Sequence, residues 1–151
     1  MTNYITQEGL NEFKKELEER LETRKEIARS IKSAKEQGDL SENAEYSAAK
    51  GEQAENERRI NWLKGIIKKS KVAEKACKEK VEVGCFVELG KEKTGAINKF
   101  QVVGTHETNP AAGKISYESP IGRALMGKTV GNKIEVETPM GKDEYLIKSI
   151  S

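Results

Sequence analysis

Three carboxylates close together in the sequence are the side chains best suited to chemistry. Asp39, Glu42 and Glu45 lie in segment 37–46, which interrupts a long, highly charged stretch with helical composition. No histidine or cysteine lies nearby, so a metal held here would have oxygen ligands only. Mg²⁺ is usually bound by one or two carboxylates together with waters and phosphates. The segment could therefore contribute part of a metal site that another molecule completes, where a second Mg²⁺ would activate water for phosphodiester hydrolysis.

The same segment also has a purely structural interpretation. Glu42 follows Asp39 at the spacing of a helix capping box, and acids are favoured in the first turn of a helix. Gly38 is a natural terminator for the preceding helix. A cap needs one acid or two, however, and this segment has three. Spacing alone leaves both interpretations open.

Basic residues precede the acidic segment. Between Ile27 and Lys35 there is no acid, and Arg29, Lys32 and Lys35 recur at a helical spacing. Lys50 comes near them if the chain folds back. These residues form either an ordinary solvated face or a stripe that contacts phosphates.

Two apolar stripes predict the element that carries these residues. If the chain reverses near residue 40, apolar residues whose numbers sum to about 80 face one another, as in an antiparallel coiled-coil hairpin. The apolar match breaks in the middle, where Arg24 would face Asn56 and Ile27 would face Gln53. We expect a polar layer there. Arms of about 30 residues give a hairpin roughly 45 Å long. The two stripes consist of Leu10, Phe13, Leu17, Leu21, Ile27, Ile31 and Ala34, and of Tyr46, Ala49, Ile60, Leu63 and Ile67.

The second half of the chain has the pattern of strands. Ser119 is a predicted N-cap for a short helix through Met126, with Pro120 at its first position. We therefore expect an α+β protein with a helical hairpin over residues 1–76, its tip at 38–46, and a small sheet domain over 77–151. Helix is expected from Thr6 to about Lys75. Strands are predicted at 81–83, 85–89, 100–103, 114–117, 134–137 and 144–147.

Composition bounds the class of protein. Charged residues make up 34% of the chain and aromatic residues 5%, which suits a long solvated helix better than a large core. The N-terminal residues contain no apolar run, so the sequence predicts neither a secretory signal nor a membrane span. Cys77 and Cys85 are the only cysteines, too few for a disulfide framework or a zinc site. We therefore expect a cytoplasmic protein with reduced thiols.

Two motifs resemble a known family. The run Gly38-Asp39-Leu40-Ser41-Glu42-Asn43-Ala44-Glu45-Tyr46, followed by Ala48-Ala49-Lys50, is similar to the tip signature of the bacterial Gre transcript-cleavage factors. The run from Ser119 to Lys128 resembles that family's C-terminal signature. The resemblance extends nearly end to end, and the A-type factors are the more similar.

The resemblance implies a fold and a function. The family has an N-terminal coiled-coil hairpin and a C-terminal FKBP-like antiparallel β-sheet domain with a short helix. That domain docks on RNA polymerase, the hairpin enters the secondary channel, and the tip stimulates the polymerase's own Mg²⁺-dependent cleavage of backtracked RNA. Such a factor is not itself an enzyme. It is expected to act in the cytoplasm as a regulator of transcription and to be classed with DNA-binding proteins. It is also expected to be a monomer when free.

The resemblance also assigns roles to residues of this chain. Asp39 and Glu42 are implied to be the catalytic acids and to share Mg²⁺ with the polymerase, with no cofactor bound by the free protein. Lys35 and Lys50 stand where the family often has Arg, and Lys makes no bidentate contact with phosphate. Residues implied to support the tip are Ser41, Asn43, Glu45 and Tyr46. Residues implied to contact the 3′ end of the RNA are Arg29, Lys32, Lys35 and Lys50. Residues implied to contact the polymerase are Ser119, Pro120 and Ile121.

Two other functions stay open. A hairpin of the same shape could occupy the channel and inhibit polymerase without stimulating cleavage. Alternatively, the chain could be a coiled-coil adaptor whose tip acids only cap a helix.

Overall fold

The computed structural model describes residues 3–38, 43–73, 77 and 79–151. The chain divides into two compact units, one formed by residues 10–69 and the other by residues 1–9 together with 70–151. The expected domain boundary after residue 76 adjoins residues 74–76, which lie outside the described residues.

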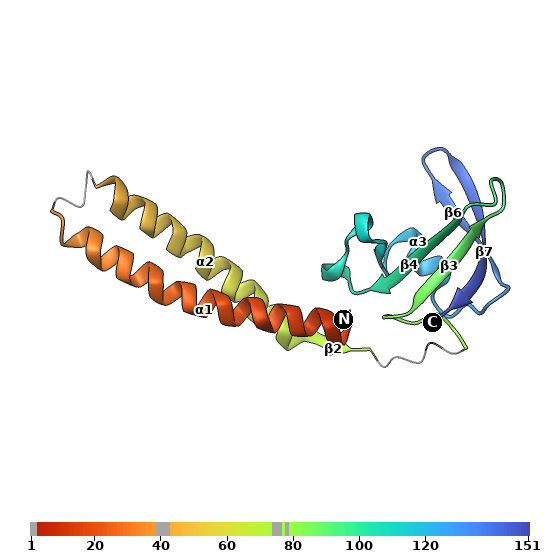
Figure 1. Cartoon of the computed structure of the whole chain (residues 1–151), viewed down its shortest axis with the longest axis horizontal. Coiled ribbons are helices and arrows are strands. Elements are labelled where there is room, and N and C mark those ends of the chain that lie inside the picture. The colour runs from red at the N-terminus through yellow and green to blue at the C-terminus, as the bar shows by residue number, and fades with distance from the viewer. Residues whose placement is uncertain (1–2, 39–42, 74–76, 78) are drawn as a thin grey trace. The chain divides into compact units, whose positions relative to one another are not determined.

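The first unit is a helical hairpin. α1 (Gln7–Lys35) and α2 (Ala44–Lys69) run in opposite directions, and the chain reverses between them (Figure 1). Ile27, Ile31 and Ala49 form a buried cluster near the tip, with Tyr46 packed against it. Ile60 and Leu63 are fully buried further along α2. The predicted hairpin is therefore confirmed. At the other end of the seam, Phe13 packs edge-on against Trp62, with ring centroids 5.7 Å apart.

The predicted polar layer lies in the middle of the hairpin. Asn56 is buried there, and its side-chain amide donates to the Arg20 carbonyl oxygen over 3.1 Å. Arg24 forms two hydrogen bonds with the Glu57 carboxylate, at 2.7 and 2.9 Å. A buried amide needs such partners, because leaving a polar group unsatisfied costs about 1–3 kcal/mol. At this layer, hydrogen bonds link the two helices where apolar contacts do not.

Two short strands lie at the chain ends of the hairpin, and the sequence prediction missed both. β1 (Asn3–Ile5) precedes α1, and β2 (Ser70–Val72) follows α2. They pair in parallel, with Tyr4 opposite Lys71. The expectation of helix to about Lys75 is therefore wrong, since α2 ends at Lys69. The backbone pairing between distant segments overrides the helical preference of this Lys-rich stretch.

The second unit contains a five-stranded sheet in the order β5-β4-β3-β7-β6. All neighbouring strands are antiparallel except β4 and β5, which are parallel, so the sheet is mixed. The predicted α+β architecture is confirmed (Figure 1). The strands are β3 (Phe86–Lys91), β4 (Ile97–Val103), β5 (Lys114–Ser116), β6 (Lys133–Thr138) and β7 (Gly141–Ile150). Two 3₁₀ turns, η1 (Thr105–Glu107) and η2 (Pro110–Ala112), join β4 to β5.

The core of this unit lies between the sheet and α3 (Pro120–Leu125). Val87, Leu89 and Leu125 are fully buried there. Residues 81–83 also contribute to the buried core but form no strand, which corrects the sequence prediction. The reason is a turn, in which the Cys85 amide donates to the Glu82 carbonyl oxygen and Gly84 adopts a positive φ of 98°.

The two cysteines are joined by a disulfide. Cys77 and Cys85 have Cα atoms 5.6 Å apart, within the range that a disulfide spans. The expectation of reduced thiols is wrong for this structure. Two cysteines are too few for a framework, but they are enough for one bridge.

Among the helices of the described residues, none is both long enough and apolar enough to cross a lipid bilayer.

Candidate functional site

Asn43 organises the start of the second hairpin helix. Its side-chain oxygen accepts a hydrogen bond from the Tyr46 amide over 3.1 Å, which is the geometry of an N-cap. Its side-chain nitrogen donates to the Ala34 carbonyl oxygen over 2.8 Å, near the end of α1. One side chain therefore caps α2 and ties it to α1 on the other side of the tip.

This geometry assigns the N-cap of α2 to Asn43. A cap at Asp39 requires a helix that begins at Leu40, whereas α2 begins at Ala44. Asp39, Ser41 and Glu42 themselves lie outside the described residues. The capping requirement of α2 is met by Asn43, so it does not account for the two acids.

The ends of the tip are otherwise arranged as the sequence predicts. Gly38 has a φ of 115°, in the left-handed region that glycine tolerates after a helix. Glu45 lies in the first turn of α2, where a negative charge is favoured by the helix dipole, and its side chain is exposed. Tyr46 is half-buried and packs against the apolar cluster of Ile27, Ile31 and Ala49. Tyr46 therefore joins the tip to the hairpin seam.

Ion pairs are concentrated on the part of the hairpin away from the tip. Arg59 contacts the Glu16 carboxylate at 2.6 and 2.8 Å, and Arg20 lies 3.5 Å from the same carboxylate. Hydrogen bonding from Arg59 lowers the pKa of Glu16 below its ordinary value. In the same way, hydrogen bonding from Arg24 lowers the pKa of Glu57. These positive charges are therefore largely neutralised inside the hairpin.

The basic residues nearer the tip are different. Arg29, Lys32 and Lys35 are exposed on α1, and none of them lies within 4.0 Å of a carboxylate oxygen of the described residues. Lys50 is exposed on α2, where its ammonium group donates to Gln53 over 3.1 Å. We call Arg29, Lys32 and Lys35 the basic stripe. No carboxylate of the described residues neutralises its charge.

The three predicted docking residues lie together at the start of α3. The Ser119 hydroxyl accepts a hydrogen bond from the Gly122 amide over 3.1 Å, which confirms the predicted N-cap. Pro120 is exposed at the first turn, and Ile121 packs against the core. Gly122 fixes this corner tightly, because a Cβ at that position would lie 1.9 Å from the Ser116 carbonyl oxygen. Pro120 is thus the docking candidate whose side chain is most exposed.

Sequence reasoning missed two features of the hairpin. The link from Asn43 to Ala34 joins residues on opposite sides of the tip, and no local motif reports it. Arg59 stacks over the Trp62 ring at 4.3 Å while it also pairs with Glu16. The spacing of Arg59 and Trp62 on one helical face was the available signal for that contact.

The donor set at the tip suits an ion shared with another molecule. Among the described residues, no group of three or more histidine, cysteine, aspartate or glutamate side chains is placed to hold a metal ion. Asn43 already uses its amide for Tyr46 and Ala34. The remaining candidates, Asp39, Glu42 and Glu45, offer only carboxylate oxygens, which suit Mg²⁺ when further ligands come from elsewhere.

Comparisons with known proteins agree over both units. Residues 3–72 match the family model "Transcription elongation factor, N-terminal", and residues 76–151 match "Transcription elongation factor, GreA/GreB, C-term". Transcription elongation factor GreA of Thermosipho africanus is 40% identical over 148 residues, covering 97% of this chain and 95% of the relative. GreA of Lactococcus lactis subsp. lactis is 44% identical over 144 residues, covering 91% and 90%.

A solved structure is also similar. GreA factor homolog 1 (Gfh1) of Thermus thermophilus is 31% identical, with a TM-score of 0.47, and the match covers 100% of this chain and 99% of that one. Both family models and the curated relatives lead to one conclusion. The chain belongs to the GreA/GreB family of transcription elongation factors and is of the GreA type.

Proposed function

We propose that this elongation factor binds RNA polymerase and inserts its hairpin through the secondary channel to the active centre. There the tip stimulates the polymerase's intrinsic, Mg²⁺-dependent cleavage of backtracked RNA, and the arrested complex resumes elongation. The factor is not an enzyme on its own, because the substrate and the remaining metal ligands belong to the polymerase. It acts as a monomer in the cytoplasm, where transcription takes place.

The observation that carries this proposal is the cap formed by Asn43. Like charges gathered at a tip repel one another, so their presence needs a reason. Capping of α2 would be one structural reason, but Asn43 already caps that helix. A role in binding a cation from a partner then accounts for Asp39 and Glu42.

Asp39 and Glu42 would hold the shared Mg²⁺ through their carboxylate oxygens. When bound, that ion supplies charge stabilisation and a more acidic water for phosphodiester hydrolysis. The chain's own contribution is positional. Asn43 joins the last turn of α1 to the first turn of α2, and so fixes both ends of the segment that carries the acids.

The basic stripe supports contact with RNA. Arg29, Lys32 and Lys35 lie on the same arm as the tip, and their charges are not neutralised by carboxylates of the described residues. Phosphates are attracted to such side chains, and the attraction weakens as salt is raised. We assign the 3′ segment of the RNA to this stripe and to Lys50.

The sheet unit would provide the docking surface. Ser119, Pro120 and Ile121 occur together at the start of α3, in the C-terminal signature. Ser119 and Ile121 also serve the fold, as cap and core contact, so we assign the principal contact with polymerase to Pro120.

The direct test uses a stalled, backtracked elongation complex with Mg²⁺. Wild-type protein should shorten the RNA from its 3′ end. Asp39→Asn and Glu42→Gln should bind polymerase and leave the RNA intact, because each removes a metal ligand while keeping the side chain's size. Glu36→Gln is the matched control, since Glu36 is an exposed carboxylate just outside the tip signature.

The alternative functions give different results. Inhibition of elongation by wild-type protein without cleavage would identify a channel-binding inhibitor. An adaptor would show no binding to core polymerase in a pull-down. Normal cleavage by both tip variants would remove the metal role from the tip.

A further inference from the structure

One carboxylate joins two segments of the sheet unit that are distant in sequence. Glu107, in η1, accepts hydrogen bonds from the Gly104 amide and from the Thr6 amide, both over 2.9 Å. It also accepts one from the Thr6 hydroxyl. Thr6 is buried and directly precedes α1, and residues 1–9 belong to the same compact unit as Glu107. Glu107 therefore ties the start of the first hairpin helix to η1.

The bonds of Thr6 show what Glu107 does for the helix. In a capping box, the N-cap side chain bonds the amide of the third helical residue, and an acid at that third position bonds the N-cap amide. The first bond is present, because the Gly9 amide donates to the Thr6 hydroxyl oxygen over 3.0 Å. Gly9, the third helical residue, has no side chain, and Glu107 supplies the carboxylate from 101 residues away. The cap of α1 is thus complete only when η1 lies beside it.

Two glycines leave the space that this arrangement needs. A Cβ at Gly9 would lie 1.8 Å from a carboxylate oxygen of Glu107, so a side chain there would displace the carboxylate. A Cβ at Gly104 would lie 2.3 Å from the Tyr4 carbonyl oxygen, so a side chain there would displace β1. The Tyr4 ring also meets the Tyr117 ring edge-on, with centroids 5.9 Å apart. β1 and the first turn of α1 therefore pack directly on this part of the sheet unit.

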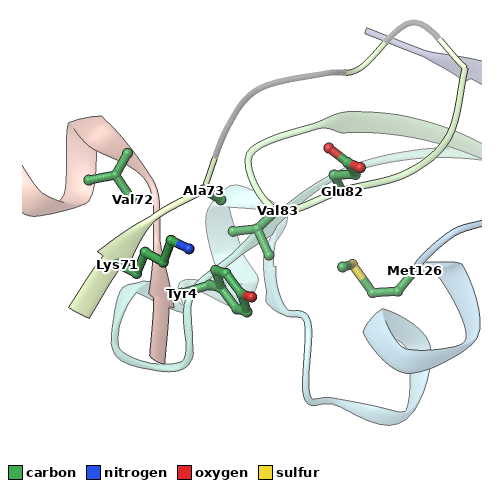
Figure 2. A pocket seen from close by; sticks show the side chains of 7 residues that line it. All are labelled: Tyr4, Lys71, Val72, Ala73, Glu82, Val83 and Met126. Carbon is green, nitrogen blue, oxygen red and sulfur yellow. The ribbon is translucent and has the colours of Figure 1, made fainter. Parts of the chain in front are cut away.

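Elsewhere the strand pair β1–β2 is more loosely packed. Figure 2 shows a cavity of roughly 520 Å³ that is lined by Tyr4 and Lys71 of the pair and by Glu82, Val83 and Met126. Side chains that line a cavity lack partner atoms on that side, so they contribute less packing. Because β2 pairs with β1, the contacts with η1 also support β2 and the helix that precedes it.

We propose that Glu107 is a positioning residue for RNA cleavage, because it fixes the start of α1 to the sheet unit. This rests on the proposed function, in which the sheet unit docks and the far end of α1 leads into the tip. α1 runs without a break from Gln7 to Lys35, which is roughly 44 Å at about 1.5 Å per residue. A tilt of about 5° at its start would move its far end by roughly 4 Å. Since a misplacement of about 1 Å can cost about 100-fold in rate, a loose start should slow cleavage without weakening docking.

The first test measures the attachment in the free protein. Amide hydrogen exchange, followed residue by residue by NMR, reports which amides are held in hydrogen bonds. Glu107→Ala should speed exchange at Thr6 and Gly104 several-fold. Glu107→Gln should keep both amides protected, because both donate to the same oxygen and glutamine retains one oxygen. Unchanged exchange in Glu107→Ala would overturn the proposal.

The second test separates the cap of α1 from the link to η1. Gly9→Glu combined with Glu107→Ala restores a local capping box. The new side chain has room, because the atoms nearest to a Cβ at Gly9 belong to the part of Glu107 that alanine lacks. The Thr6 amide should become protected again, whereas the Gly104 amide should still exchange fast. This double variant therefore has the cap without the link.

Cleavage of backtracked RNA then decides whether the link matters. With saturating factor, Glu107→Ala and the double variant should both cleave several-fold more slowly, with half-maximal concentrations close to that of wild type. Glu107→Gln should cleave nearly normally. Thr105→Ala is the matched control in η1, because it removes a 3.2 Å hydrogen bond to Glu118 that does not involve α1.

Two results would contradict the proposal, and a third concerns the proposed function. Normal cleavage by Glu107→Ala would show that the link is not needed, and normal cleavage by the double variant would show that Glu107 is only a helix cap. If wild-type protein binds polymerase without stimulating cleavage, the proposed function fails. The exchange measurements then support or overturn the attachment of α1 by Glu107 on their own.

Discussion

At the scale of single residues, Asn43 is the most informative side chain of the tip. Its amide makes one bond within α2 and one to α1, so it acts both as a cap and as a link between helices. The start of α2 therefore does not require either tip acid as its cap. The residue that belongs to the fold and the residues proposed for chemistry are different, although they are close neighbours in sequence.

Replacing Asn43 separates these two bonds. Asn43→Ala should lower the free energy of unfolding by about 1 kcal/mol or more, because it removes an N-cap as well as the bond to Ala34. Asn43→Asp keeps the capping oxygen and loses the donor, so it should lose only the link to Ala34. Urea unfolding followed by helical circular dichroism measures both. Equal losses for the two variants would mean that the cap contributes nothing.

The same pair of variants should affect RNA cleavage. Asn43→Asp leaves α2 capped but frees its start from α1, so the tip acids are held less firmly. We expect cleavage of backtracked RNA to fall with little change in the affinity for polymerase. A parallel loss of affinity would instead indicate a general disruption of the hairpin.

The sequence pointed to this tip but not to its cap. The sequence offers two good helix starts, four residues apart. One is Asp39 with Glu42, and the other is Asn43 with the turn that follows. Local preference cannot choose between them. The choice depends on the bond from Asn43 to the Ala34 carbonyl, which exists only once the two helices lie side by side.

At the scale of elements, the hairpin changes character along its length. Near the tip its seam is apolar, with Ile27, Ile31 and Ala49 buried together. Further away, Asn56 and the arginine–glutamate pairs occur alongside the fully buried Ile60 and Leu63. Polar contacts of this kind fix the register of a helical pair, because slipping would leave them unsatisfied.

The pair between Glu16 and Arg59 should make hairpin stability depend on pH. Since the folded state lowers the pKa of Glu16, the pair stabilises the fold above the ordinary carboxyl pKa and loses that effect as pH falls through the lowered value. Glu16→Gln should therefore cost about 0.5–1 kcal/mol at pH 7. The cost should shrink as the pH is lowered from about 5 to about 3.

Urea unfolding at several pH values measures this dependence. Glu22→Gln is the control on the same helix, because its pair with Lys25 is exposed, at 72% and 65% of the side chains. It should change stability little at any pH. A cost for Glu16→Gln that does not vary with pH would mean that packing, and not charge, is lost.

The basic stripe gives a prediction about RNA. Lys32→Ala and Lys35→Ala should each raise the factor concentration needed for half-maximal cleavage several-fold, and the effect should be larger at low salt. Lys25→Ala is the matched control, since Lys25 lies on the same helix but already pairs with Glu22 at 3.2 Å. Equal effects from all three variants would remove the special role of the stripe.

Apolar spacing predicted the two arms and their seam, because the helical repeat is local. It could not predict that Phe13 meets Trp62, since a shift of a few residues leaves the apolar pattern almost unchanged. It also could not find β1 and β2. Each has three residues, and they become strands only by pairing with each other.

At the scale of the whole molecule, the docking site can be tested apart from the fold. Pro120→Glu places an acid in the first turn of α3, where the helix dipole favours it, so the unit should still fold. We expect the affinity for core polymerase to fall at least about tenfold in a fluorescence anisotropy titration. Pro139→Glu, at an exposed turn between β6 and β7, is the control and should bind normally. Normal binding by Pro120→Glu would move the docking surface elsewhere.

The parallel pairing of β1 with β2 also has a consequence for how the chain folds. Asn3 pairs with Ser70, so the whole hairpin lies between the two partners in the sequence. A flexible loop of that length would make closure costly and slow, since the entropy lost on joining the ends grows with loop length. Two helices that zip together from their turn bring the ends close by mostly local contacts, which form quickly. The β1–β2 hydrogen bonds should therefore be among the last to appear during refolding, and their formation reports that the hairpin has closed along its full length.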